Sequence, residues 1–153
     1  MTVTIDNLVT PELVVLDATF AGSTEAIEAL ADRLVAAGRL TDRAGFVAAA
    51  VAREAETGGT GMEMGVAIPH AKHAGVTEPT VAVARVPDGV DFGASDAPAD
   101  LVFLIAAPAN ADDVHITVLS KLARRLIHES FRSALRDAAT PEEVVATLKK
   151  EIQ

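Results

Sequence analysis

Short apolar segments bounded by turn-forming residues divide this chain into expected strands. The strongest covers residues 101–107, Leu-Val-Phe-Leu-Ile-Ala-Ala, and Pro108 ends it. Because the segment has no polar alternation, it predicts a strand buried on both faces, in the middle of a sheet covered by helices. Further strands are expected at residues 12–16, 66–68 and 80–86. The turn-rich sequence that follows Val86 predicts a loop.

Two expected helices follow the first strand. Ser23 or Thr24 can serve as the N-cap of one helix, and Gly38 ends it. Thr41 is the expected N-cap of the second helix, which runs to about residue 56. The apolar stripes are Ile27, Leu30, Ala31, Leu34 and Val35 in the first helix, and Phe46, Val47, Ala50 and Val51 in the second. This spacing places one face of each helix on the core.

The last third of the chain predicts two more helices. One covers residues 112–127, and the other begins at Thr140-Pro-Glu-Glu143, which has the form of a capping box with proline at N1. A short segment around Phe131 and Leu135 separates the two. The residues expected to face inward are Ile116, Leu119, Ala123, Leu126, Val144, Val145 and Leu148.

Together these elements predict an α/β fold. We expect a single domain over residues 1–153, with a mixed parallel and antiparallel β-sheet flanked by helices on both faces. Half of the residues are hydrophobic, so a sizeable core can form without covalent cross-links. The absence of cysteine excludes disulfides, thiolate metal sites and cysteine nucleophiles.

Charge and hydropathy narrow the classes of function. The formal net charge of −9 argues against nucleic-acid binding, and it would attract a basic protein partner. The absence of Trp and Tyr argues against an aromatic stacking platform. The N-terminal sequence lacks the features of a signal peptide, and the longest apolar run is too short to span a bilayer. We therefore expect a soluble, cytoplasmic protein.

Two histidines occupy equivalent places after predicted strands. His70 follows the strand over residues 66–68 and the break at Pro69, and His115 opens the helix that follows the strand over 101–107. If those strands are neighbours in the sheet, both imidazoles meet at one edge, where ligand sites of α/β proteins gather. Such a pair suits phosphoryl transfer through a phosphohistidine, acid–base catalysis or metal binding.

The segment before His70 contains a cation and a glycine-rich loop. Arg53 lies near the C-terminal end of the second helix, where a positive charge suits the helix dipole. Residues 57–61, Thr-Gly-Gly-Thr-Gly, predict a flexible loop leading into the histidine strand. This loop lacks the Gly-Lys-Ser/Thr ending of a P-loop.

The stretch Gly61-Met-Glu-Met-Gly-Val-Ala-Ile-Pro-His-Ala-Lys72 resembles the active-site stretch of IIA domains of the sugar phosphotransferase system, fructose/mannitol type. The resemblance covers roughly residues 12–139 and is closest to the fructose branch. Further matching segments, in the same order as in the family, are Arg53-Glu54, 88–93, 98–108, and Asp113-Val-His115 followed by Leu119, Leu122 and Leu126. The family fold is a mixed β-sheet flanked by helices, in agreement with the fold expected above.

The resemblance implies roles for three residues. His70 matches the histidine that accepts a phosphoryl group from the phosphocarrier HPr and passes it to a IIB domain, which works with the membrane IIC permease. Its Nε2 is the expected attacking atom, while Nδ1 keeps its proton against a backbone carbonyl or a similar acceptor. His115 matches a histidine that supports the phosphoryl group by a hydrogen bond, and Arg53 matches an arginine that helps to neutralise phosphate charge. The resemblance implies no metal and no cofactor.

Two other functions compete with sugar transport. A nitrogen-type regulatory IIA protein would share the fold and the phosphohistidine, and would bind partners according to its phosphorylation state; the fructose-like match over residues 94–100 favours the sugar branch. A metal-dependent hydrolase using His70, His73 and His115 lacks support from an HExxH-type motif.

Three further residues, Lys72, His73 and His128, are assigned no role in the reaction. Lys72 is interpreted as a solvated lysine rather than a phosphate ligand. His73 departs from the small residue expected at its position and is left out of the mechanism. His128, expected late in a helix, is interpreted as a partner of the helix dipole.

Overall fold

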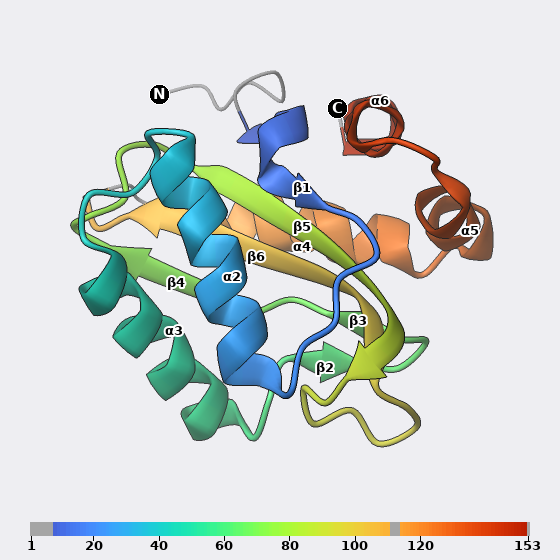
Figure 1. Cartoon of the computed structure of the whole chain (residues 1–153), viewed down its shortest axis with the longest axis horizontal. Coiled ribbons are helices and arrows are strands. Elements are labelled where there is room, and N and C mark those ends of the chain that lie inside the picture. Colours follow the sequence, from blue (N-terminus) through green and yellow to red (C-terminus); the bar gives the residue numbers. More distant parts are fainter. Residues whose placement is uncertain (1–7, 111–113, 153) are drawn as a thin grey trace.

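The computed structural model describes residues 8–110 and 114–152, and it is organised around one mixed β-sheet. Its strands run in the order β1-β5-β6-β3-β2, and β4 also pairs with β6 (Figure 1). The strands are β1 (Val14–Val15), β2 (Gly61–Met62), β3 (Val66–Ala67), β4 (His70–His73), β5 (Thr80–Val90) and β6 (Ala99–Pro108). The helical elements are η1 (Pro11–Leu13), α2 (Ser23–Ala36), α3 (Arg43–Thr57), α4 (Val114–Leu126), α5 (Glu129–Asp137) and α6 (Pro141–Ile152).

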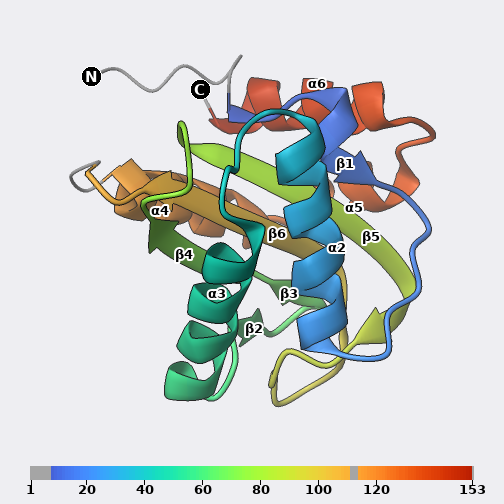
Figure 2. The ribbon, with the colours of Figure 1, turned by 60° about the vertical axis from the view of Figure 1, so that its left-hand side comes forward.

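Strand β6 is the centre of the sheet, as its apolar sequence predicts. It pairs antiparallel with β5 and parallel with β3 and β4. Alternate residues enter two different cores: Val102 and Leu104 pack beneath α2 and α3, whereas Phe103 and Ile105 pack beneath α4, α5 and α6. Helices therefore cover both faces of the sheet (Figures 1 and 2), and the predicted α/β fold class is confirmed. Among the described residues, no helix combines the length and apolarity needed to cross a bilayer.

Two strands differ in extent from the prediction. Only Val14 and Val15 of the predicted first strand are extended, because the preceding residues form the 3₁₀ turn η1. Strand β5 continues to Val90, through residues that were predicted to form a loop. The register against β6 shifts between Arg85 and Val90, and such a bulge accommodates Pro87, which has no N–H to donate.

Helix α3 begins one residue later than predicted. Asp42, not Thr41, is the N-cap, and its carboxylate accepts a hydrogen bond from the N–H of Gly45 at 3.0 Å. The hydroxyl of Thr41 instead donates to the carbonyl of Gly75 at 3.2 Å. Either residue type can cap a helix, so the choice depends on this long-range contact with the turn after β4.

Helix α2 matches its predicted span but not all of its predicted inner face. Its N-cap is Gly22 and Ser23 is its first residue, so the predicted cap at Ser23 or Thr24 was wrong. Four of the five expected inward residues are fully buried, whereas the side chain of Val35 is 43% exposed. Gly38 follows the helix with a φ of 74°, the left-handed conformation typical of a helix end.

Helix α6 begins where its start signal at residues 140–143 predicts. The hydroxyl of Thr140 accepts a hydrogen bond from the N–H of Glu143 at 3.2 Å, and the carboxylate of Glu143 accepts one from the N–H of Ala139 at 2.9 Å. The segment that was expected between the last two helices is itself the helix α5. His128 is the residue before α5 rather than a residue late in a helix, which corrects its interpretation.

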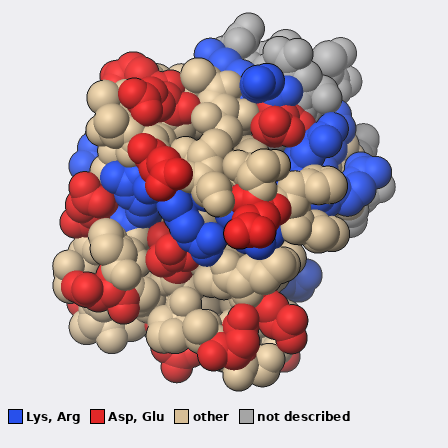
Figure 3. All heavy atoms as spheres, turned by 90° about the vertical axis from the view of Figure 1, so that its right-hand side faces the viewer, with Lys and Arg blue, Asp and Glu red and all other residues tan. Residues whose placement is uncertain are grey.

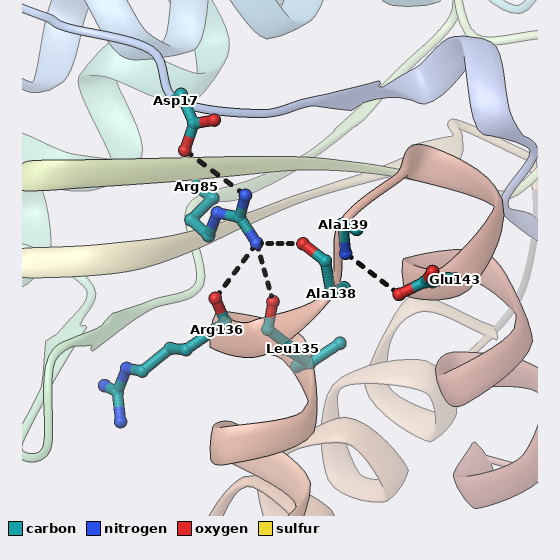
Figure 4. Close-up of polar contacts among 7 residues, drawn as sticks. All are labelled: Asp17, Arg85, Leu135, Arg136, Ala138, Ala139 and Glu143. Carbon is teal, nitrogen blue, oxygen red and sulfur yellow. Dashed lines mark hydrogen bonds and ion pairs between the residues drawn. The ribbon is translucent and has the colours of Figure 1, made fainter.

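Arg85 of β5 fixes the end of α5 to the sheet (Figure 4). Its Nη1 donates to the carbonyl oxygens of Leu135, Arg136 and Ala138 at 3.3, 3.0 and 2.6 Å, and its Nη2 contacts Asp17 at 3.2 Å. The last carbonyls of a helix have no partner within it and form its negative end. A largely buried guanidinium therefore satisfies several of these acceptors at once.

Arg136, in the last turn of α5, holds the loop between β2 and β3. It forks onto the Asp100 carboxylate at 2.8 and 2.9 Å and also donates to the carbonyl of Met64 at 2.7 Å. The N–H of Met64 donates to Asp96, and this bond is the main cause of the lowered pKa of that carboxyl. On this side of the molecule, acidic and basic side chains are interspersed (Figure 3).

Replacing Arg85 by methionine tests its role in the fold. We expect Arg85→Met to lower the free energy of unfolding by about 1–3 kcal/mol, because buried helix-end carbonyls lose their donor. Urea unfolding followed by circular dichroism measures the change. Arg33→Met, at an exposed arginine of α2, is the control. Equal midpoints for the two variants would show that the Arg85 contacts contribute nothing specific.

Candidate functional site

His70 lies within an extended ribbon that pairs with β6. In β3, Val66 is paired with Leu101, and in β4, His70 is paired with Ile105, so both strands keep one register along β6. Pro69 separates them because it lacks an N–H, but its carbonyl still accepts a hydrogen bond from the N–H of Ile105 at 2.9 Å. His70 therefore opens a second strand, which corrects the expectation that it lies just beyond the end of one.

The imidazole of His70 has a fixed hydrogen-bond partner. Its Nδ1 lies 2.8 Å from the carbonyl oxygen of Ile68. Because a carbonyl oxygen can only accept, Nδ1 carries the proton, and the neutral ring then has its lone pair on Nε2. Pro69 restricts the preceding Ile68 to extended backbone conformations, so the direction of this carbonyl is constrained. Ile68 thus provides the backbone acceptor that was expected.

A pocket of about 440 Å³ lies between α3 and β4 beside this ring. Its lining residues are Ala49, Ala52, Arg53, Glu56, His70, Ala71 and Lys72. Two of the three predicted site residues, His70 and Arg53, therefore line one pocket. The guanidinium of Arg53 is about half exposed and lies 4.0 Å from the carboxylate of Glu56. Lys72 is exposed and lies on the same side of β4 as His70, two residues away.

His115, the third predicted site residue, lies only in part within the described structure. Its backbone is in the first turn of α4, and its side chain is outside the described residues. The strand before His70 is β3 and the strand before His115 is β6, and the two are neighbours, since Val66 is paired with Leu101. The condition for bringing both histidines to one edge of the sheet is therefore met.

His73 performs a structural task at the turn after β4. Its Nδ1 accepts a hydrogen bond from the N–H of Gly75 at 2.9 Å, and its Nε2 lies 3.9 Å from the carboxylate of Asp42. The neutral His73 ring is therefore the opposite tautomer to that of His70, with its proton on Nε2. A Cβ on Gly75 would lie 2.8 Å from that of Asp42, so this turn packs closely against the start of α3.

The positions of the histidines bear on the metal-site alternative. His70 and His73 are three residues apart in one strand, so their side chains leave β4 on opposite sides. Over residues 8–110 and 114–152, with the side chain of His115 not included, no group of three His, Cys, Asp or Glu residues could hold a metal ion. A hydrolase using His70 and His73 as joint ligands therefore finds no support in this geometry.

The glycine-rich loop before the histidine ribbon is closely packed, in contrast to its expected flexibility. Gly58 ends α3 with a φ of 76°. A Cβ on Gly59 would lie 2.0 Å from the carbonyl oxygen of Phe92, and one on Gly61 would lie 2.8 Å from the same oxygen. The glycines thus allow the loop to approach the segment after β5.

A buried carboxylate anchors this loop from α3. Glu54 is 9% exposed, and its Oε2 accepts a hydrogen bond from the N–H of Thr60 at 2.7 Å. Its Oε1 accepts another from the hydroxyl of Thr60. Although Glu54 belongs to the matching Arg-Glu pair in the sequence, no role was predicted for it. Buried carboxylates are rare unless they have partners, but nothing local in the sequence marks this one as buried.

Residues 7–151 match the family described as phosphoenolpyruvate-dependent sugar phosphotransferase system, EIIA 2. The PTS system fructose-specific EIIA component of Haloferax volcanii is 41% identical, with full coverage of both chains. The fructose-specific EIIABC component of Bacillus subtilis is 36% identical over 92% of this chain, which spans 22% of that longer protein.

Solved structures show the same relationship. The nitrogen regulatory protein IIA-Ntr from Neisseria meningitidis has a TM-score of 0.83 and 35% identity, covering 92% of this chain and 96% of its own. Enzyme IIAMTL from Escherichia coli, in a complex with phosphorylated enzyme IIBMTL, has a TM-score of 0.79 and 29% identity, covering 94% and 99%. The resemblance found in the sequence is confirmed. The chain belongs to the EIIA type 2 family of the sugar phosphotransferase system, and it is a IIA phosphotransferase component.

Proposed function

We propose that this protein accepts a phosphoryl group from phospho-HPr on Nε2 of His70 and passes it to a IIB domain for sugar uptake, with fructose as the proposed sugar. The observation that carries the proposal is the hydrogen bond between His70 Nδ1 and the carbonyl of Ile68 beside a pocket that Arg53 also lines. It leaves the opposite ring nitrogen with its lone pair. The full-length match to a fructose-specific EIIA component supports the choice of sugar.

The transfer step needs no prior deprotonation of the nucleophile. The lone pair of His70 Nε2 forms the new bond to phosphorus, while the bond between phosphorus and the donor atom of phospho-HPr breaks and the donor keeps that electron pair. The phosphorylated ring retains its proton on Nδ1 and gains positive charge, which the carbonyl of Ile68 stabilises. Transfer to a IIB domain reverses these changes. Such a reaction depends mainly on in-line placement and on stabilisation of charge.

Arg53 is the proposed source of charge stabilisation. Its guanidinium can fork onto two phosphoryl oxygens. In the present structure its contact with Glu56 is 4.0 Å long and exposed, and pairs of this kind contribute little to stability. Arg53 can therefore turn to the phosphoryl group at small cost. For His115, at the start of α4, we propose a hydrogen bond to the same group.

The proposed partners are HPr, a IIB domain and, through it, the membrane IIC permease. A structural neighbour of this chain, IIAMTL, is seen in a complex with phosphorylated IIBMTL. Relatives named EIIABC components are several times longer than this chain, which corresponds to a minor part of their length. No metal or cofactor is part of the proposed reaction.

A regulatory function is the second candidate, because the nitrogen regulatory protein of Neisseria meningitidis is similar in structure over nearly its full length. The two functions share phosphorylation of His70 and differ in the next acceptor. We expect the phosphorylated protein to transfer its phosphoryl group to a purified fructose-type IIB domain within seconds to minutes, measured by intact mass of both proteins. If the protein keeps its phosphoryl group in the presence of several IIB domains, the result would favour the regulatory function.

Replacing His70 tests the proposed acceptor. Incubation with enzyme I, HPr and phosphoenolpyruvate should add one phosphoryl group to the wild type and none to His70→Ala, as measured by intact mass. His115→Ala should be labelled more slowly than the wild type. His128→Gln, at an exposed position before α5, should be labelled normally and serves as the control. Undiminished labelling of His70→Ala, or an unlabelled wild type with a fructose-type HPr also tried, would contradict the proposal.

The ring state of His70 provides a test that requires no partner protein. In ¹⁵N-labelled wild type with neutral histidines, we expect Nδ1 of His70 to be protonated because Ile68 accepts its hydrogen bond. His73 should show the opposite state, since its Nδ1 accepts from the N–H of Gly75. Long-range ¹H–¹⁵N correlation spectra distinguish the two tautomers, and His73 is the internal control. A neutral His70 protonated on Nε2 would refute the assigned nucleophile.

A further inference from the structure

A chain of hydrogen bonds connects the buried carboxylate of Glu54 to the ring of His70. Glu54 accepts both the N–H and the hydroxyl of Thr60. The carbonyl of Thr60 accepts the N–H of Ile68 at 3.3 Å, and the carbonyl of Ile68 accepts the Nδ1–H of His70 at 2.8 Å. Each link joins a different segment, so the chain runs from α3 through the glycine-rich loop to the histidine ribbon.

The direction of the Ile68 carbonyl is constrained from both sides. On one side, the bond to Thr60 continues the antiparallel pairing of β2 with β3, in which Gly61 faces Ala67. On the other side, Pro69 restricts the backbone of Ile68 and is itself held to β6 through its carbonyl. Like Ile68 and Pro69, Thr60 lies outside the regular strands. Its position therefore depends on what holds it, and Glu54 provides two of its hydrogen bonds.

The end of α3 does not require the Glu54 side chain. The N–H of Gly59 donates to the backbone carbonyl of Glu54 at 2.9 Å, and the hydroxyl of Thr57 donates to the carbonyl of Arg53 at 3.1 Å. These backbone acceptors are the ones that a helix end leaves unsatisfied. The carboxylate instead reaches past the helix end to Thr60. Burying a carboxylate is costly unless hydrogen bonds compensate, which indicates that this contact has a specific purpose.

We infer that Glu54, acting through Thr60, is a positioning residue for the phosphoryl acceptor. It holds the loop so that the carbonyl of Ile68 faces His70 Nδ1, and this keeps the proton on Nδ1 and the lone pair on Nε2. The catalytic part of this inference rests on the proposed function, whereas the structural part does not. Glu54 also follows Arg53 in α3, so a single helical turn holds the loop with one side chain and lines the pocket with the other.

The ring state of His70 in Glu54 variants tests the inference directly. In Glu54→Ala, the ¹⁵N shifts of His70 Nδ1 and Nε2 should move toward each other, because the ring then exchanges between two tautomers. The shifts of His73 should stay in place. Phosphorylation by phospho-HPr should slow by roughly 10- to 100-fold, a common cost of losing the group that orients a reacting side chain.

Glu54→Gln is the conservative variant. Its amide oxygen can accept from the N–H of Thr60, and its NH₂ can donate to the Thr60 hydroxyl, which accepts as well as donates. We expect Glu54→Gln to keep the wild-type His70 shifts and to retain most of the phosphorylation rate. Thr57→Ala is the matched control, since it removes hydrogen bonds of the same loop that do not lead to His70. Its His70 shifts should match those of the wild type.

The outcomes separate a positioning role from a merely structural one. If Glu54→Ala melts at a lower temperature but leaves the His70 shifts unchanged, Glu54 only stabilises the fold and the inference is overturned. If Glu54→Ala does not fold, Thr60→Val removes the hydroxyl link alone and should move the shifts in the same direction by a smaller amount; unchanged shifts would again overturn the inference. A wild type that phospho-HPr does not label would refute the proposed function, while the ring-state test still decides the structural inference.

Discussion

The parallel pairing of residues 66–73 with β6 is the constraint on which the site depends. Strand β6 is buried on both faces and held by β5 on its other edge, so it is a rigid reference for its neighbours. The histidine ribbon keeps one register along β6 on both sides of Pro69. This register determines the place of His70 beside α3, and it brings the end of β4 next to the end of β6, after which α4 begins.

Within this frame, the structure controls the orientation of the His70 ring. A neutral imidazole is a nucleophile near neutral pH, so the proposed phosphoryl transfer requires that the ring present the correct nitrogen. The carbonyl of Ile68 meets that requirement for His70, whereas the N–H of Gly75 favours the opposite tautomer of His73. One strand therefore carries two histidines of opposite tautomer, each determined by a backbone group.

A carboxylate near the proposed phosphoryl site would ordinarily repel a phosphoryl group. Glu54 avoids this conflict because both of its oxygens accept hydrogen bonds from Thr60, on the loop side of α3. Among the described residues, Arg53, Lys72 and one acidic residue, Glu56, line the pocket. In a chain with a net charge of −9, Arg53 and Lys72 thus give this pocket local positive charge, which suits the proposed phosphoryl group.

Local sequence determined the buried central strand, the helices with their 3.6-residue stripes, the capping box of α6 and the family resemblance that singled out His70 and Arg53. These features repeat or cluster within a few residues, so periodicity and motif spacing reveal them. Only the tertiary structure decided that Asp42 rather than Thr41 caps α3, that β5 continues past Pro87, and that the Glu54 carboxylate is buried against Thr60. The reason is that each of these depends on partners supplied by folding: a turn that occupies Thr41, a neighbouring strand that accepts a bulge, and a loop that folds back onto the helix.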